Sequence, residues 1–259
     1  MNRLRQAIGF VAVILVLAVV VISSSAAQVA EKKDQKRVLL HEFGRGFILS
    51  LGGKLFDNLW TGTDLTPPKG THPNYPKGLA ASGPQTWRCI ACHGWDYKGA
   101  EGMLGKVKKD PAFKSLRSLA GVDPNIIMEK FRKAPHNYPE GKLPNLTLDM
   151  LATFISYGQY DRDAYLDEAG KSRGDWKKGR DIYEGACMNC HQVDGRAYLE
   201  GEQGDKSSLG WIARNRPEQA LHKIRNGVPG ADMIAIRFLE DRQIIDLFAY
   251  LQHLDQREK

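Results

Sequence analysis

The sequence predicts an all-α fold of two tandem helical domains that follow an N-terminal apolar segment. The motif Cys-x-x-Cys-His occurs twice, at residues 89–93 and 187–191, and no cysteine lies outside it. The residues after the two copies match without gaps at an offset of 93, so that 223–225 falls on 130–132. Toward the end of each half, apolar residues recur three and four positions apart, as in an amphipathic helix, and no alternating strand pattern surrounds either motif.

Length and charge limit the possible partners. A chain of 259 residues suits two small domains. Lys and Arg total 37 against 30 Asp and Glu, a formal net charge of +7. This excess is not gathered into basic runs interleaved with aromatic residues, so we expect no nucleic-acid partner. A mildly basic surface favours acidic protein partners or anionic lipid headgroups.

The N-terminus, residues 1–30, has the order of an export signal. Arg3 and Arg5 precede an unbroken apolar run over residues 7–22, and small residues follow at 25–27. About 20 apolar residues are also enough to span a bilayer, with the arginines on the cytoplasmic side. We expect a retained membrane anchor, with the rest of the chain facing the periplasm or another extracytoplasmic space. The alternative is cleavage, which would leave a soluble periplasmic protein.

Both motifs are typical of covalent c-type haem attachment. Two thiols three residues apart can each bond one vinyl group of a haem, and the adjacent histidine can then supply imidazole to the iron. The sequence therefore predicts two covalently bound haem c groups. The attaching residues would be Cys89, Cys92, Cys187 and Cys190, and the proximal ligands would be His93 and His191.

Three other uses of the cysteine pairs fit the sequence less well than haem attachment does. A four-thiolate zinc site usually has its pairs much closer in sequence. A thioredoxin-like redox pair would need a βαβ context, and a disulfide between cysteines three residues apart has awkward geometry. The trailing histidine, found twice, favours haem.

Helix start and stop signals are similar after each motif. Asp123 is expected to cap a helix that starts at Pro124. In the second half, a helix is expected to start at Pro217 and to end before Gly227. His222, on this second helix, is expected to be a surface side chain.

The two halves differ in length before the motif. Gly53 lies 36 residues ahead of Cys89, whereas Gly179 lies 8 ahead of Cys187. About 28 residues rich in Pro, Gly and Thr have therefore been inserted, as an ordered loop or a partner-facing flap. The predicted boundaries are a first domain at 44–159 with the inserted loop at about 61–86, a charged linker at 160–174, and a second domain at 175–256.

In each half a loop leads to a terminal amphipathic helix, at about 146–158 and 239–253. This order of helix, motif, helix, loop and terminal helix resembles the class I cytochrome c family, arranged as a tandem di-haem cytochrome c with an N-terminal signal-anchor. The resemblance covers about residues 44–254. It implies an α-helical fold around each haem and a role as electron carrier. It also implies a sixth iron ligand, commonly a methionine, from the loop before the terminal helix.

The two loops before the terminal helices carry different candidate ligands. The second loop carries Met233, which we expect to be the distal ligand of the second haem. At the offset of 93, its counterpart in the first loop is Glu140, and a carboxylate is a poor substitute for a thioether on this iron. Imidazole is a common haem ligand and His136 lies on the same loop, so we expect His136 at the first haem. Met103 and His72 remain alternatives.

These expectations favour an electron carrier between redox protein partners over an enzyme. Ligation by His93 and His136 would lower the potential of the first haem, so that electrons would run from the first haem to the second. The alternative is a di-haem oxidoreductase for a small inorganic donor such as thiosulfate, which would need an exchangeable ligand at the first iron. A third hypothesis is a fixed cytochrome subunit of a membrane redox complex.

Overall fold

The computed structural model describes residues 44–107, 110, 113–138, 141–197 and 208–254. The predicted signal-anchor at 1–30 and Glu140 lie outside these residues. In the described part the elements are helices, apart from an isolated bridge between Leu166 and Ser172, which agrees with the all-α prediction. None of these described helices is long and apolar enough to cross a membrane. Contacts divide the chain between Arg45 and Gly46 into two compact units, and both Cys-x-x-Cys-His motifs lie in the second.

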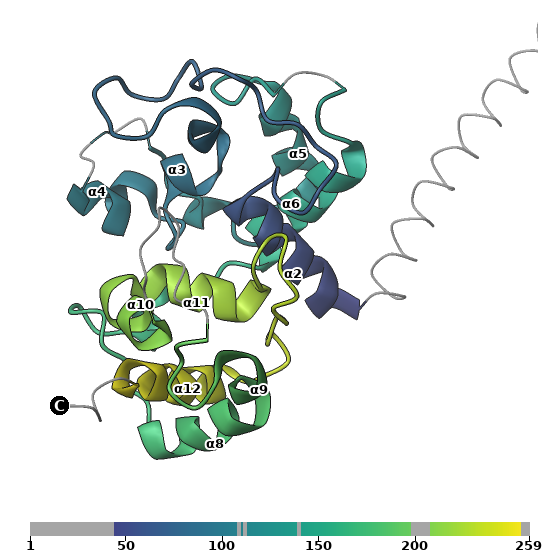
Figure 1. Cartoon of the computed structure of the whole chain (residues 1–259). Coiled ribbons are helices and arrows are strands. Elements are labelled where there is room, and N and C mark those ends of the chain that lie inside the picture. Colours follow the sequence, from purple (N-terminus) through teal and green to yellow (C-terminus); the bar gives the residue numbers. More distant parts are fainter. Residues whose placement is uncertain (1–43, 108–109, 111–112, 139–140, 198–207, 255–259) are drawn as a thin grey trace, which may run out of the picture. The chain divides into compact units, whose positions relative to one another are not determined.

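Helices frame each motif (Figure 1). The first half contains α2 (Gly44–Asp57), the motif helix α3 (Ile90–His93), α4 (Met103–Val107), α5 (Pro124–Arg132) and the terminal helix α6 (Asn145–Tyr157). Short 3₁₀ turns lie at Gly83–Trp87, Gly99–Glu101 and Arg117–Leu119. The second half is reached through α7 (Arg162–Tyr165) and contains α8 (Trp176–Ala186), the motif helix α9 (Met188–His191), α10 (Leu209–Asn215), α11 (Pro217–Asn226) and the terminal helix α12 (Asp241–His253).

The helix ends follow the sequence signals. The Asp123 carboxylate accepts from the N–H of Asn125, and Pro124 opens α5. Helix α11 begins at Pro217 and ends at Asn226, and the next residue, Gly227, has φ +83°, a left-handed conformation that favours glycine. These predicted boundaries are confirmed.

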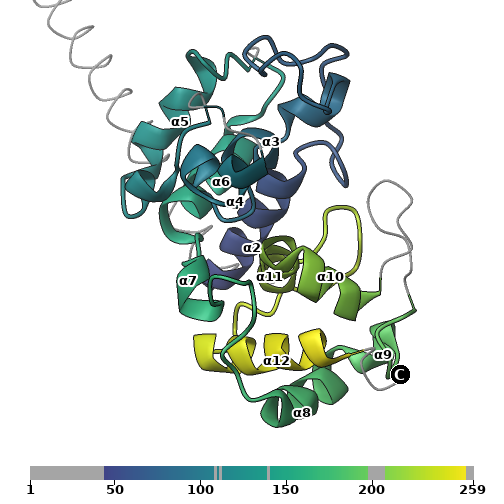
Figure 2. The same cartoon turned by 90° about the vertical axis from the view of Figure 1, so that its left-hand side faces the viewer.

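A glycine lets the first helix of each half pack closely on the terminal helix. In the second half α12 lies across α8 (Figure 1, Figure 2), and a Cβ at Gly179 would collide with the backbone of Asp246. In the first half a Cβ at Gly52 would collide with the backbone of Met150 and with Phe154 on α6. The sequence comparison paired Gly53 with Gly179, which is wrong by one residue. Gly53 instead faces Asn226 of α11.

The offset between the two halves changes before the terminal helix. Helices α5 and α11 begin at 124 and 217, which are 93 residues apart as the sequence match requires. Helices α6 and α12 begin at 145 and 241, which are 96 apart, and the residues that meet the crossing glycines, 150 and 246, are also 96 apart. The ungapped match of 239 to 146 is therefore wrong by three residues, because α11 is one residue longer than α5 and the loop before α12 is two residues longer than the loop before α6.

The inserted segment 61–86 is ordered by hydrogen bonds within the first half, and at Gly62 it also lies against Gly230 of the second half. The Trp87 indole N–H donates to the carbonyl of Gly70 (2.8 Å). The Thr86 hydroxyl accepts from the N–H of His72 (2.8 Å) and donates to the carbonyl of Gly83 (2.6 Å). Of the two forms expected from the sequence, the structure fits the ordered loop.

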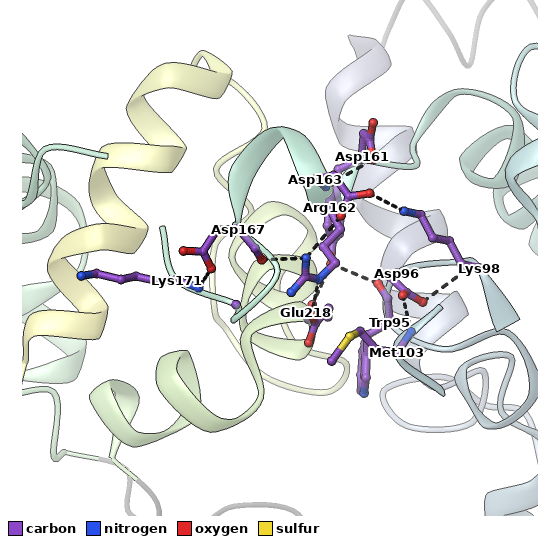
Figure 3. A network of polar contacts seen from close by, with 12 residues as sticks. Trp95, Asp96, Lys98, Met103, Asp161, Arg162, Asp163, Asp167, Lys171 and Glu218 are labelled. Atoms are coloured by element: carbon purple, nitrogen blue, oxygen red, sulfur yellow. Dashed lines mark hydrogen bonds and ion pairs between the residues drawn. The ribbon is translucent and has the colours of Figure 1, made fainter. Parts of the chain in front are cut away.

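Residues 160–174, expected to be a charged linker, are packed rather than extended. Arg162 lies buried against Glu218 of α11, with its Nε 2.5 Å from the carboxylate, and also donates to the carbonyl of Asp167 (2.9 Å), as Figure 3 shows. Tyr165 and Leu166 are buried in the hydrophobic core. The charge of Arg162 is neutralised by a carboxylate from the other half.

The core forms one continuous cluster that draws on both halves. It gathers around the terminal helices, where Phe154 of α6 and Phe248 of α12 are fully buried. Aromatic rings from outside these helices complete it, among them Phe56, Tyr97 and Tyr183. The motif helices lie at its edge, with Cys89 and Cys187 partly buried against it.

Candidate haem-binding sites

Each motif forms a single helical turn that presents its cysteines and histidine together. In the first motif the N–H of Cys92 and of His93 both point to the carbonyl of Cys89 (3.2 and 3.0 Å). In the second, the N–H of Cys190 and of His191 point to the carbonyl of Cys187 (3.2 and 2.9 Å). Residues three apart on a helical turn lie on one face, which suits two thiols that bond the same flat group.

The geometry does not favour the other uses of the cysteines. None of the four cysteines forms a disulfide. Within the described residues, no group of three or more His, Cys, Asp or Glu side chains could hold a metal ion, so the two pairs do not combine into a zinc site. Burial, with a smaller contribution from the Cys92 thiol, raises the pKa of Cys89 to about 12, and burial raises that of Cys187 to about 11. A thiol redox pair needs the opposite shift.

His93 and His136 lie ring to ring in the first half. Their ring centroids are 6.0 Å apart, with an angle of 38° between the planes. Two imidazoles on opposite sides of one metal ion, at metal–nitrogen distances of about 2 Å, have centroids about 6 Å apart. The separation therefore fits an iron held between these two rings.

Hydrogen bonds leave one nitrogen of each ring for a ligand. His93 donates through Nδ1 to the carbonyl of Lys114 (2.7 Å), and His136 donates through Nδ1 to the carbonyl of Lys130 (3.0 Å). Neither Nε2 has a hydrogen-bond partner among the described residues. Carbonyl contacts of this kind fix the tautomer and orientation of ligating histidines. Burial lowers the pKa of His93 to about 4 and also lowers that of His136, so both rings are neutral, as metal ligands must be.

In the corrected alignment of the two halves, His136 lies one position from the residue that corresponds to Met233. Met233 is the eighth residue before α12, and the eighth residue before α6 is Asn137. His136 is therefore one residue from the counterpart of Met233, whereas the ungapped match placed that counterpart at Glu140. The assignment of His136 as a ligand stays a prediction, and this register supports it.

The other candidates for the first site are placed differently. His72 accepts from the N–H of Asn74 at Nδ1 (3.1 Å) and donates from Nε2 to the carbonyl of His136 (3.0 Å). Both of its nitrogens are thus engaged, which does not suit a ligand. Met103 begins α4, and its N–H donates to the carboxylate of Asp96 (2.7 Å; Figure 3).

Met233 lies on a tightly folded loop between α11 and α12. It is partly buried and packs against the core, as do Cys187 and Met188. A Cβ at Gly227 would lie 2.6 Å from the Met233 carbonyl, so only glycine allows this close approach. The N–H of Ile236 donates to the carbonyl of Ile224 on α11 (3.1 Å) and closes the loop. Met233 is thereby held on the loop from which the predicted ligand should come.

His222 is fully buried, so its expected place at the surface is wrong. Its Nε2 donates to the carbonyl of Gly53 (2.9 Å), and its Nδ1 accepts from the Tyr97 hydroxyl (2.9 Å). Phe56 and Trp95 pack on the ring. Burial lowers its pKa to about 3. No local pattern in the sequence indicates this contact, because the partners lie more than 120 residues away in the other half.

Comparison with protein families bears on the second half. Residues 174–251 match the family model described as Cytochrome C oxidase, cbb3-type, subunit III. This match supports a cytochrome c family. A cytochrome c domain carries covalently bound haem c and works by haem-based electron transfer. The first motif lies outside the matched residues, and comparison with curated proteins gives no match.

Proposed function

We propose that the protein is a di-haem c-type cytochrome that passes electrons between redox protein partners. The observation that carries the proposal is the pair formed by His93 and His136, with their rings 6.0 Å apart and each Nδ1 bound to a carbonyl. The family match supports haem at the second motif. The apolar N-terminus supports a membrane anchor, with the haem domains in the periplasm or another extracytoplasmic space.

The residues of the first site would hold a haem in one orientation. Cys89 and Cys92 would attach it, while His93 and His136 would bind the iron. The carbonyls of Lys114 and Lys130 hold the two imidazoles in place through Nδ1. Bound haem supplies an iron that takes up and releases one electron without making or breaking a bond.

The second site would differ in one ligand. Cys187 and Cys190 would attach the haem, with His191 and Met233 on the iron. Thioether ligation raises the potential of a haem relative to a pair of imidazoles. Electrons would therefore run downhill from the first haem to the second.

Two protein ligands at each iron favour a carrier over an enzyme. An oxidoreductase for a small donor such as thiosulfate would need an iron with an open or exchangeable position. Carbon monoxide tests this on the reduced holoprotein, because two firmly six-coordinate haems resist it. We expect little binding to wild type, binding at the first haem of His136→Ala, and binding at the second haem of Met233→Ala.

The control for this experiment is His253→Ala. His253 stacks on Trp176 at the end of α12, with the ring centroids 4.5 Å apart, and belongs to neither proposed ligand pair. It should leave carbon monoxide binding unchanged. Unchanged spectra in His136→Ala would remove His136 as a ligand, and rapid binding to wild type would favour the enzyme.

A fixed cytochrome subunit of a membrane redox complex is a second candidate function. The matched family model is described as a subunit of an oxidase, which favours this possibility. The two functions share the haem sites and differ in the partner. Purification in mild detergent discriminates between them, because a subunit would remain bound to an integral membrane oxidase or reductase and a mobile carrier would not.

A further inference from the structure

We propose that His72 is a positioning residue that holds His136 in place for the first haem, so that the inserted segment acts as a strap. The strap is residues 61–86, and the ligand loop is residues 133–138, directly after α5. This inference rests on the proposed function, because it takes His136 as the ligand. The proposal gives the inserted segment a role. The second half lacks this segment and does not need that role.

The strap holds two neighbouring carbonyls of the ligand loop. His72 Nδ1 accepts from the N–H of Asn74 (3.1 Å), so the ring proton lies on Nε2. That proton is donated to the carbonyl of His136 (3.0 Å). The Asn74 side-chain amide donates to the carbonyl of Pro135 (2.5 Å). Two side chains of the strap thus bind the backbone of the predicted ligand and of the residue before it.

The strap is itself fixed beside the haem motif. The His72 ring packs on Trp87, with centroids 4.3 Å apart, and the N–H of His72 donates to the Thr86 hydroxyl (2.8 Å). Trp87 lies two residues before Cys89, and its carbonyl accepts from the Tyr138 hydroxyl at the far end of the ligand loop (2.8 Å). His72 and Tyr138 therefore connect both the middle and the end of the loop to the stretch that attaches the haem.

The ligand loop needs such support because little else covers it. Its residues 133–135 and Asn137 are exposed, and Asn137 has φ +49°, uncommon for a residue other than glycine. Within the loop, the N–H of His136 donates to the carbonyl of Lys133 (3.0 Å), and its ring donates to Lys130. With the His136 carbonyl held by His72, the backbone around the predicted ligand and its ring are fixed, and the ring centroid stays 6.0 Å from that of His93.

The experiment compares three variants of the strap in the reduced holoprotein. His72→Phe keeps a ring against Trp87 but removes both hydrogen-bonding nitrogens. His72→Gln restores an amide N–H for the His136 carbonyl. Thr71→Val is the matched control, because the exposed Thr71 hydroxyl accepts from the N–H of Gly83 (2.9 Å) within the strap and has no contact with the ligand loop among the described hydrogen bonds.

Two readouts report on the ligand loop. One is the rate at which carbon monoxide binds the first haem, and the other is hydrogen exchange at the amides of His136 and Tyr138. Loss of one hydrogen bond typically shifts the equilibrium between the closed and the open ligand loop about five- to tenfold. We expect both rates to rise by about this factor in His72→Phe, to return most of the way in His72→Gln, and to stay at the wild-type value in Thr71→Val.

The outcomes separate this inference from the function on which it rests. If His136→Ala leaves the spectrum unchanged, the ligand assignment fails and the strap proposal fails with it. If His136→Ala opens the first haem but His72→Phe changes neither rate, the ligand stands and the strap proposal is overturned. Should His72→Phe not yield holoprotein, Asn74→Ala removes only the bond to Pro135. A smaller rise in both rates then supports the strap, and no rise overturns it.

Discussion

His222 is a neutral imidazole enclosed where the two halves of the chain meet. Both of its nitrogens have partners in the first half, the Gly53 carbonyl and the Tyr97 hydroxyl. Burial lowers its pKa to about 3, with the carbonyl contact opposing the shift only in part. Protonation would leave a cation in the core with Nδ1 facing a hydroxyl that donates to it, so the folded protein disfavours the charged form.

This burial predicts a specific pH dependence of stability. Because the unfolded chain binds a proton at His222 near pH 6.5 and the folded protein only near pH 3, the stabilisation is complete above pH 6.5 and is lost as the pH falls toward 3. The free energy of unfolding should fall by about 2 kcal/mol at this site between pH 7 and pH 5. Urea unfolding of wild type and His222→Gln over this range measures it. The slope against pH should be shallower in the variant, and parallel curves would contradict the prediction.

Single residues were predictable where a local pattern defines them. The cysteines and His93 are predicted from the motif alone, and His136 is predicted because it shares a loop with the expected ligand position. The roles of His72 and His222 could not be found in this way. Their partners lie 64 and more than 120 residues away, and no local periodicity or spacing encodes such contacts.

Helices α8 and α12, the first and last helices of the second half, cross with their backbones in close contact. Gly179 brings the two backbones together, and the Tyr183 and Tyr250 rings, 5.3 Å apart, pack beside the crossing. Helix extents were predictable from caps and apolar spacing. The residue-by-residue correspondence between the two halves was not predictable. A length difference before the terminal helix leaves the sequence similarity on either side of it intact.

Two glycines of α8 should respond in opposite directions to alanine. Gly179→Ala places a Cβ against the backbone of Asp246, which cannot move aside, and should lower the free energy of unfolding by about 1–3 kcal/mol or more. Gly185 lies on the same helix with nothing within 4 Å of an added Cβ. Gly185→Ala should therefore raise stability by about 0.5–1 kcal/mol through helix propensity. Denaturant unfolding of both holoprotein variants measures this, and equal effects would contradict the close crossing.

Over the whole molecule, the two halves are joined by buried polar contacts as well as by a shared core. Arg162 pairs with Glu218, and both side chains are buried. Arg237, in the loop before α12, donates to the carbonyl of Gly158 at the end of α6 (2.8 Å). The repeated motif predicts a duplication, but it does not predict this joint, since each partner seen alone is an ordinary surface charge. A fixed joint would matter for the proposed function, because electron transfer between two haems depends on their separation.

The final prediction concerns the difference between the halves. If His136 ligates the first haem and Met233 the second, a potentiometric titration should resolve two one-electron steps, with the bis-imidazole haem at the lower potential. Met233→His should lower the upper step toward the lower one, because it gives the second haem the same ligand pair. His253→Ala, at the end of α12 and outside both ligand pairs, should leave both steps in place. A single step shared by both haems of the wild-type protein would show that the duplicated sites have stayed equivalent, and the direction of electron flow would then have to come from the partners rather than from the ligands.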